Sequence, residues 1–578
     1  MNIILTTLNA KYIHSSLALR YLKAYSEQDF PQIEIMEFSI KEPITNILND
    51  LYQKKPDVIG FSSYIWNIEE TIELVRLIKK VLPNIKIILG GPEVSYDLDY
   101  WFKRVKEIDY IVIGEGEETL NHLLKAIKEE LSIAEVLGIA YREGERYHVT
   151  KSRPALTLDT IPTPYKVEDL ASLKDKIVYF EASRGCPFSC AYCLSSIETG
   201  VRYFSIERVK EDLLRIIQSG VKTIKFVDRT FNIHKKYAME IFQFLIDNHQ
   251  DTVFQFEITA DIMKDDVIQF LVDNAPANIF RFEIGIQSTN EYTNSLINRR
   301  QNFERIKNTV LKFKNSKKVD QHLDLIAGLP EEDYMSFRKT FNDVFALRPE
   351  ELQLGFLKML RGTPIWLEAK KYNYVYMDKA PYEILQNHVL SFDDVIRIKQ
   401  VEDILEKYWN DHRMDHTINY LINNEFASPF DFFQEFGEFW SGQGYNRIGH
   451  QLEALFERLQ EFLETKNGMN LEFVMSLMKL DYFLNFKHKP RKTWWDFSLT
   501  KSEQMTFMKK LVIEPEQIGS EFAALELKET NIHKHVMLER IPYDLAKYLQ
   551  LGEIQKGDTL LIVYYNPPST PNFYMALV

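Results

Sequence analysis

Cysteine is the scarcest residue of this chain, with three in 578 residues. An extracellular disulfide scaffold carries more of them, usually in even number, so the sequence excludes that class. A run of about 18 uncharged apolar residues, which a membrane-spanning helix needs, is also missing. The first residues, Met1–Thr7, lack the basic start and the long apolar core of a signal peptide, so we expect none. These absences predict a soluble protein of the reducing cytoplasm.

An excess of positive charge is missing as well. Asp and Glu number 83 against 70 Lys and Arg, which gives a formal net charge of −13. This balance argues against nucleic-acid binding over the whole surface. Hydrophobic residues make up 45% and charged residues 26%, which is ordinary for a globular chain that buries large cores. The length corresponds to roughly three or four domains.

Residues 1–150 alternate between short apolar strands and amphipathic helices. The expected strands are Asn2–Thr7, Val58–Ser62, Ile85–Leu89 and Tyr110–Ile113, and the expected helices include Ser15–Tyr25 and Ile68–Val81. This alternation predicts an α/β domain with a Rossmann-like, doubly wound parallel sheet. Ligands of such sheets bind beyond the carboxyl ends of the strands. The segments there are Thr7–Tyr12, Ser62–Asn67, Gly90–Glu93 and Gly114–Glu118.

Residues 151–175 are interpreted as a linker, because they contain three prolines among polar residues. A second series of strands and helices follows over residues 176–375, and it predicts a partial (β/α)6 barrel that is open on one side. Its expected strands are Ile177–Ala182, Thr223–Val227, Val253–Ile258, Ile279–Ile286, His322–Ala327 and Glu351–Lys358.

Residues 376–578 change character and predict a mainly helical C-terminal accessory domain with terminal strands. Helical periodicity covers 383–408, 446–465 and 469–485, and strands joined by a Pro-Pro turn are expected at Asp558–Tyr565 and Asn572–Val578. The aromatic run Phe426–Trp440 is interpreted as helix packing, and Met475, Met478 and Leu480 as core. The basic and aromatic segment Lys487–Trp495 could contact phosphate and bases, but a solvated loop with a packed tryptophan pair is favoured over nucleic-acid binding.

All three cysteines lie in one short window, at Cys186, Cys190 and Cys193, directly after an expected barrel strand. Three thiols at this spacing can hold one small metal cluster from a single loop. A structural zinc ion normally takes four protein ligands, and the window contains no histidine. A four-iron cubane held by three thiolates keeps one iron open for a substrate or cofactor, and Tyr192 lies beside it. Zinc with a ligand from elsewhere, or thiols gathered by chance, are the less favoured alternatives.

The segment Ser183–Cys193 resembles the signature of the radical S-adenosylmethionine (SAM) superfamily. Three further segments resemble motifs of the same superfamily. Phe226–Asn232 resembles the strand-two motif at the methionine end of SAM, Glu283–Ser288 the strand-four motif near the ribose, and Asp324–Glu331 the strand-five motif near the adenine. Their order and spacing fit the six-strand barrel.

The resemblance implies a mechanism. Cys186, Cys190 and Cys193 would hold a [4Fe-4S] cluster whose open iron chelates the amino and carboxylate groups of SAM. The reduced cluster cleaves SAM, and a 5′-deoxyadenosyl radical abstracts hydrogen from the substrate. The electron would come from a donor such as flavodoxin or ferredoxin.

The same resemblance suggests which residues meet SAM. Asp228 pairs with the methionine ammonium or caps a helix, and these two interpretations stay open. Glu283 and Gln287 alternate inward on the fourth strand, so a pocket role is favoured over core packing. Arg184 supports the cluster loop or makes only a structural ion pair. The remaining predicted SAM contacts are Tyr192, Ser288 and Gly328.

The N-terminal domain resembles the cobalamin-binding domain that precedes the barrel in one large radical SAM class. Glycines after the strands let the corrin and its nucleotide tail approach the backbone, and Trp66 could cover a corrin face. Another nucleotide-binding domain, or a purely structural one, is the alternative. The residues that match are Ser62, Ser63, Trp66, Gly90, Gly91, Pro92, Glu93, Gly114, Glu115, Gly116 and Glu117.

Two departures from related patterns narrow the prediction. Cobalamin domains that replace the lower axial base use an Asp-x-His-x-x-Gly motif, and His14, His122 and His148 do not fit it. We therefore expect base-off cobalamin without a histidine ligand. Methylthiotransferases carry three additional cysteines for a second cluster, and this chain has none left. Sulfur insertion through such a cluster is excluded.

The sequence thus predicts a cobalamin-dependent radical SAM enzyme that methylates an unactivated carbon, or phosphorus, of an unknown substrate. Methylcobalamin would supply the methyl group. One alternative keeps the cofactors but gives a rearrangement or cyclisation. Another is a non-catalytic iron–sulfur module that binds RNA or protein, which the four SAM motifs disfavour.

Overall fold

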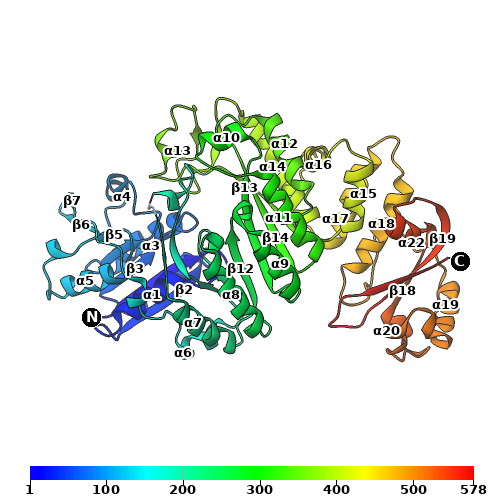
Figure 1. Ribbon diagram of the computed structural model, residues 1–578, viewed down its shortest axis with the longest axis horizontal. Coiled ribbons are helices and arrows are strands. Elements are labelled where there is room, and N and C mark those ends of the chain that lie inside the picture. The colour runs from blue at the N-terminus through cyan, green and yellow to red at the C-terminus, as the bar shows by residue number, and fades with distance from the viewer. Residues whose placement is uncertain (198–199, 578) are drawn as a thin grey trace. The chain divides into compact units, whose positions relative to one another are not determined.

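The computed structural model describes residues 1–197 and 200–577. It divides into two compact units, residues 1–395 and residues 396–578. The first unit contains both α/β parts (Figure 1). In the described ranges, helices long and apolar enough to span a membrane are absent.

A seven-stranded sheet of order β2-β1-β3-β4-β5-β6-β7 forms the N-terminal domain. Its strands are β1 (Ile3–Asn9), β2 (Ile33–Ser39), β3 (Val58–Ser62), β4 (Lys86–Gly90), β5 (Tyr110–Val112), β6 (Ile139–Glu143) and β7 (Arg146–Val149). The first five pair in parallel, whereas β6 pairs antiparallel with both β5 and the edge strand β7. The doubly wound sheet is confirmed, while β2, β6 and β7 were not predicted.

Helices cover both faces of this sheet. Helices α1 (Leu17–Ser26) and α5 (Glu117–Ile127) pack on one face, with Ile3 and Leu5 of β1. Helices α2 (Ile44–Gln53), α3 (Ile68–Val81) and α4 (Leu98–Arg104) pack on the other, with Ile4 and Leu8. Because both faces are buried, the central strands are continuous apolar runs. That is why their positions could be predicted.

The second sheet has six parallel strands in the order β15-β14-β13-β12-β11-β8. Its edge strands β8 and β15 do not pair with each other, so the predicted partial barrel is confirmed. The strands are β8 (Ile177–Phe180), β11 (Thr223–Phe226), β12 (Val253–Ile258), β13 (Phe280–Gln287), β14 (Val319–Ala327) and β15 (Glu351–Phe356). Helices on its outside include α7 (Ile206–Gln218), α8 (Lys235–Asn248), α9 (Asp265–Asn274), α11 (Phe303–Ser316) and α12 (Tyr334–Phe345) (Figure 1).

The outer face of the barrel sheet is a layer of phenylalanines. Phe256 of β12 and Phe282 of β13 are fully buried, and both contact Phe242 of α8. Phe282 also meets Phe313 of α11. The residues that alternate with this layer point to the inner face, which we call the lumen, and most of them are polar. They include Lys225, Gln255, Glu257, Arg281, Glu283, His322, Asp324, Glu351 and Gln353.

The lumen residues bond to one another across the strands. Lys225 Nζ lies 2.7 and 2.8 Å from the Glu283 carboxylate oxygens, and Arg281 Nη2 lies 2.5 Å from Glu351 Oε2. A (β/α)8 barrel normally fills this space with branched apolar side chains. The polar lumen here suits a polar ligand instead.

The helical C-terminal prediction is confirmed in outline. The second unit contains α15 (Asp415–Asn424), α16 (Pro429–Gly442), α17 (Leu452–Glu464), α18 (Leu471–Leu484) and α19 (Lys501–Ile513). An antiparallel sheet follows, in the order β18 (Val536–Tyr543), β19 (Lys556–Tyr564) and β20 (Asn572–Leu577). The predicted last strand also included Val578, which lies outside the described residues.

The prediction of a helix over residues 383–408 is wrong at its N-terminal end. Strand β17 (Ile384–Gln386) pairs with β16 (Val375–Tyr376), and α14 (Phe392–Leu405) begins only after it. Tertiary packing explains why this segment is a strand and not a helix, because Ile384 is fully buried and packs over the backbone of Gly328.

The core residues predicted for the second unit are largely confirmed. The phenylalanines and the tryptophan on the inner side of α16 are buried, and so are Met478 and Leu480, while Met475 is half-buried. Trp494 and Trp495 pack against each other and Tyr482, at 5.0 and 5.5 Å between ring centroids for the latter contacts. The interpretation of the tryptophans as a packed pair is therefore confirmed.

Candidate active site

The cysteine loop leaves the carboxyl end of β8 through a short hairpin. Strand β9 (Ser183–Cys186) pairs antiparallel with β10 (Gly200–Tyr203), and Cys186 is the last residue of β9. Gly185 has φ +100°, and a Cβ there would lie 2.1 Å from the Gly200 carbonyl oxygen, so only glycine fits. The hairpin was not predicted from the sequence.

The three thiols of the loop are free. Burial is the main cause that raises the pKa of the Cys186 thiol, and Cys190 is 8% exposed. Backbone hydrogen bonds hold the loop, from Ala191 N to Ile297 O at 2.9 Å and from Ile365 N to Ala191 O at 3.0 Å. Among residues 1–197 and 200–577, no three Cys, His, Asp or Glu side chains lie in a geometry that could hold one metal ion. The case for a cluster therefore rests on the donor set, three free thiols on one anchored loop.

Arg299 lies beside this loop and was missed by the sequence reasoning. Its Nη1 is 3.1 Å from the Tyr192 hydroxyl and 3.8 Å from Cys190 Sγ, and its Nη2 donates to the Gly285 carbonyl. Burial and the nearby cysteine raise the pKa of Tyr192. Arg299 and its neighbour Arg300 follow α10 (Glu291–Leu296), and two arginines just after a helix look like a solvated surface in sequence.

Asp228 does not cap a helix, so that interpretation was wrong. The residue that caps α8 is His234, whose ring accepts from Tyr237 N. The buried Asp228 carboxylate instead accepts from Ala182 N at 3.0 Å and from Ser183 Oγ at 2.5 Å. Burial raises its pKa to about 7. Asp228 thus fixes the corner between β8 and β9, at the entry to the cysteine loop.

The predicted strand-four and strand-five residues surround the carboxyl end of β13 and β14. Glu283 faces the lumen and bonds to Lys225. Gln287 has φ +69° and lies over Gly285, where a Cβ would be 2.3 Å from Gln287 Nε2. Its buried Oε1 has no partner among the described residues. Ser288 is fully buried and donates to Glu332 Oε1 at 2.5 Å.

Gly328 follows β14, where its φ is +89°. A Cβ there would lie 1.8 Å from Ile384 Cδ1, so the packing of β17 requires glycine. The tyrosine hydroxyl of Tyr374 donates to the Gly328 carbonyl at 2.9 Å.

The loop after β3 is shaped by one buried amide. Asn67 Nδ2 donates to Thr7 Oγ1, Leu8 O and Ser62 O at 3.1–3.2 Å, and its Oδ1 accepts from Tyr64 N at 2.8 Å. This arrangement leaves Trp66 45% exposed and stacked on Tyr64, with ring centroids 4.3 Å apart. A flat aromatic face is thus presented at the carboxyl edge of the sheet.

The loop after β4 touches the loop after β3. Ser63 N donates to Gly90 O at 2.7 Å, and the fully buried Ser63 Oγ has no partner among the described residues. Gly91 has φ +108°, and a Cβ there would lie 2.5 Å from the Ser63 carbonyl oxygen. The close approach leaves no room for a side chain at Gly91, while Pro92 is exposed.

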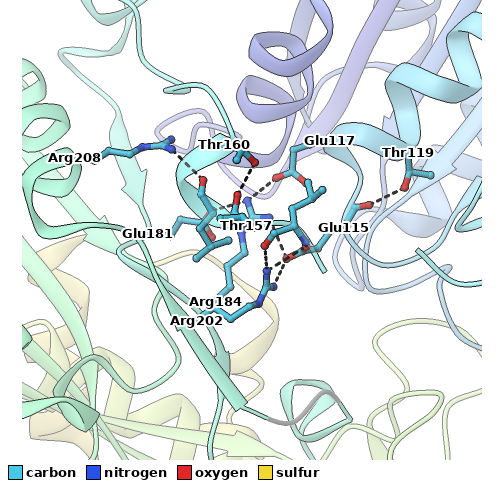
Figure 2. A network of polar contacts seen from close by, with 11 residues as sticks. Glu115, Glu117, Thr119, Thr157, Thr160, Glu181, Arg184, Arg202 and Arg208 are labelled. Atoms are coloured by element: carbon cyan, nitrogen blue, oxygen red, sulfur yellow. Dashed lines mark hydrogen bonds and ion pairs between the residues drawn. The ribbon is translucent and has the colours of Figure 1, made fainter. Parts of the chain in front are cut away.

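Three carboxylates predicted at this edge bond to the barrel side of the unit. Glu93 accepts from the Tyr382 hydroxyl at 2.6 Å, and burial raises its pKa to about 7. Glu117 pairs with Arg184 at 2.5 Å, and Glu115 pairs with Arg184 and Arg202 (Figure 2).

Gly114 and Gly116 lie in the same loop as Glu115. Space is open at Gly114, which has φ +75°, and a Cβ at Gly116 would lie 2.9 Å from Leu22 Cδ2.

The loop after β1 contacts the barrel as well. Ile177 N donates to Ile13 O at 2.7 Å, Ser15 Oγ donates to Ile177 O at 2.8 Å, and the Tyr179 hydroxyl lies 2.8 Å from His14 Nδ1. The loops after β1, β4 and β5 therefore bring the carboxyl edge of the N-terminal sheet against the barrel.

Comparison with known proteins agrees with this architecture. Residues 3–124 match the B12 binding domain, residues 180–344 the radical SAM superfamily, and residues 370–563 a protein family of unknown function, DUF4080. The cysteine loop and most of the partial barrel lie within the stretch that matches the radical SAM superfamily. The chain thus combines a B12-binding domain, a radical SAM domain and a DUF4080 region, in this order. These domains imply a [4Fe-4S] cluster, SAM and cobalamin.

Two curated relatives illustrate the family. The uncharacterized methyltransferase PH0819 of Pyrococcus horikoshii is 30% identical over 39% of this chain and 51% of its own length. The 2-(S-pantetheinyl)-carbapenam-3-carboxylate methyltransferase of Streptantibioticus cattleyicolor is 26% identical over 60% of this chain and 53% of its own. The chain thus spans about half the length of these relatives.

Two solved structures share the fold. The cobalamin-dependent SAM radical enzyme OxsB with aqua-cobalamin has a TM-score of 0.57 at 17% identity, over 83% of this chain and 79% of its own. The radical SAM methyltransferase TsrM from Kitasatospora setae, with cobalamin and a [4Fe-4S] cluster, has a TM-score of 0.55 at 15% identity, over 66% and 76%.

Proposed function

We propose that this protein is a cobalamin-dependent radical SAM methyltransferase that methylates an unactivated carbon of a polar substrate. One observation carries the proposal. The carboxyl edge of the B12-type sheet meets the barrel through three loops, and one of them bonds to the hairpin that carries Cys186. A cofactor on that edge and a cluster on the cysteine loop would therefore share one reaction space. Methyltransferases among the relatives support the same activity.

Cys186, Cys190 and Cys193 are the proposed cluster ligands. The residues around them hold the loop, because Asp228 fixes its entry and the half-buried Arg299 places a cation beside Cys190. When bound, the cluster and SAM supply radical chemistry, and cobalamin supplies a carrier for the methyl group. An electron donor such as flavodoxin or ferredoxin would reduce the cluster.

The proposed SAM site lies where β11, β13 and β14 end. Glu283 presents a carboxylate to the lumen, and the orphan Gln287 Oε1 offers an acceptor that a ligand N–H or O–H would satisfy. Tyr192 lies against Arg299, and the glycine at 328 keeps the backbone close to its neighbours. Asp228 and Ser288 would act through the backbone they hold, because their polar atoms bond within the fold.

The proposed cobalamin site is the edge formed by the loops after β3, β4 and β5. Ser62 and Ser63 are buried there, and Ser63 Oγ has no hydrogen-bond partner among the described residues. The Trp66 ring would cover a corrin face, and the open space at Gly114 would let the corrin approach the backbone. The glycines at 90, 91 and 116 allow close packing within the domain. Pro92 and the backbone of Glu93, Glu115 and Glu117 belong to the same edge. We propose base-off cobalamin without a histidine ligand.

Anaerobic reconstitution with iron, sulfide, cobalamin and dithionite tests the proposal. We expect 5′-deoxyadenosine from SAM with the wild type and none with Cys190→Ala. SAM labelled in its methyl group should transfer label to cobalamin and then to a product in a cell extract. Cleavage of SAM without label in either place would favour a rearrangement or cyclisation. Absence of cleavage would leave a non-catalytic module.

A further inference from the structure

A buried ion-pair network joins the N-terminal domain to the cysteine hairpin (Figure 2). Arg184, on β9, donates from Nε and Nη2 to Glu181 at 2.9 and 2.7 Å, from Nη2 to Glu117 at 2.5 Å, and from Nη1 to Glu115 at 3.3 Å. Every nitrogen of one guanidinium is used. Two of its three carboxylate partners, Glu115 and Glu117, lie where the loop after β5 enters α5.

The opposite strand of the hairpin joins the same network. Arg202, on β10, pairs with Glu115 and donates to Leu156 O at 2.7 Å, and Glu115 Oε2 accepts from Leu156 N at 3.0 Å. Both strands of the hairpin are thus bonded to one loop of the N-terminal domain, and so is the segment that connects the two domains.

The Arg184 part of the network is largely shielded from solvent, whereas Arg202 is 35% exposed. The exposed fractions are 15% for Arg184, 6% for Glu117, 11% for Glu181 and 19% for Glu115. The Arg184 guanidinium also lies over the Tyr21 ring of α1, at 5.3 Å from its centroid. A buried pair holds its geometry because breaking it leaves an uncompensated charge in a low dielectric. A contact of this kind fixes position more firmly than a surface ion pair does.

We propose that Arg184 is a positioning residue that sets the location of SAM on the cluster relative to the cobalamin. The inference rests on the proposed function. Arg184 stands two residues before Cys186 and bonds to the loop that contains Gly114–Glu117, where cobalamin is proposed to bind. One side chain therefore ties the two cofactor-bearing segments together. Neither Arg184 nor Arg202 needs to touch a cofactor for this role.

The substitution Arg184→Lys distinguishes the effect of the guanidinium geometry from the effect of its positive charge. A lysine ammonium keeps the positive charge but places its three donors on one atom, so it cannot reach three carboxylates as the planar fork does. Arg20→Lys is the matched control, because Arg20 pairs with Glu37 at 2.7 Å inside the N-terminal domain, both side chains being 10% exposed. Arg202→Lys tests the same hairpin if Arg184→Lys fails to bind iron or cobalamin.

The first measurement uses the reconstituted full-length protein. We expect Arg184→Lys to form 5′-deoxyadenosine within about threefold of the wild type, while label transfer from the SAM methyl group to cobalamin falls by at least about tenfold, since small misplacements strongly slow a reaction between positioned groups. Arg20→Lys should keep both rates within about twofold. Equal loss of both rates in Arg184→Lys, or no loss of label transfer, would overturn the proposal.

The second measurement needs no cofactor. Amide hydrogen exchange of the segments 183–186 and 200–203 should rise by at least about tenfold in Arg184→Lys and stay unchanged in Arg20→Lys, because the hairpin opens locally when its bonds to the neighbouring loop are lost. Unchanged exchange would overturn the proposal. If the wild type neither cleaves SAM nor labels cobalamin, the proposed function fails, and this exchange still decides whether Arg184 holds the hairpin.

Discussion

Replacing Gly91 with alanine tests the edge where cobalamin is proposed to bind. The glycine has φ +108°, and the added Cβ would lie 2.5 Å from the carbonyl oxygen of Ser63 and 3.1 Å from its nitrogen. Both atoms belong to the backbone, so they yield only if the loop after β3 moves. That movement would break the 2.7 Å hydrogen bond from Ser63 N to Gly90 O.

The magnitude follows from these two effects. A left-handed backbone costs a residue with a Cβ about 1–2 kcal/mol. The lost hydrogen bond adds about 0.5–1.5 kcal/mol. If the original loop is restored only when cobalamin binds, a total of about 1.5–3.5 kcal/mol appears as lost affinity, which is roughly 10- to 400-fold.

Equilibrium dialysis of cobalamin against the full-length protein measures the change. Gly144→Ala is the control, because Gly144 has φ +60° in the turn between β6 and β7 and nothing lies within 4 Å of an added Cβ. This variant carries backbone strain without a clash and without a link to the proposed site. A cobalamin affinity of Gly91→Ala within about twofold of the wild type would refute the reasoning, because a cost of about 2 kcal/mol corresponds to roughly 30-fold in affinity.

Three further predictions concern the barrel. Arg299→Met should lower the reduction potential of the reconstituted cluster by on the order of 100 mV, because the nearby guanidinium stabilises the more negative reduced state. A redox titration followed by electron paramagnetic resonance measures this potential. An unchanged potential would contradict the prediction. Glu332 has a pKa raised from 4.5 to about 7, chiefly by burial, so the folded state keeps a proton that the unfolded state releases. The free energy of unfolding should therefore fall by up to about 3 kcal/mol as pH rises from 4.5 to 7, and Glu332→Gln should remove that part of the slope, as urea midpoints at several pH values would reveal. Parallel curves for the two proteins would be inconsistent with this. Phe256→Ala should lower the free energy of unfolding, measured in urea, by about 3–5 kcal/mol, because Phe256 is fully buried in the phenylalanine layer. Gln255→Ala should lower it by less than about 1 kcal/mol, because Gln255 faces the lumen. Equal losses would argue against the layer as the main core.

Strands buried on both faces were predictable, and edge strands were not. Val58–Ser62 and the helix Ile68–Val81 were predicted with the bounds that the structure gives. Strand β2 carries Glu34 and Glu37 among its apolar residues, and β7 is largely exposed, so neither shows a continuous apolar run. Periodicity detects burial, and an edge strand that pairs on one side gives little of it.

The candidate site divides in the same way. The cysteine loop is local in sequence, so its spacing alone was informative. Arg299 lies more than a hundred residues from Cys190, and Glu117 lies 67 residues from Arg184, so their meeting depends on the fold. The acidic residues after β4 and β5 looked like ligand contacts, and the structure shows carboxylates that also bond to the barrel side. A charged residue in a ligand-binding loop cannot be assigned one partner from sequence.

The phenylalanine layer has a consequence for how this protein can change. The buried phenylalanines of the barrel lie between the sheet and its helices, whereas the inner face carries mainly polar residues, several of which bond to one another. Exchanges on the inner face therefore leave the main hydrophobic core untouched. Evolution can alter which molecule the barrel accepts with little loss of folding stability, as can an engineer who randomises Gln255 or Gln353.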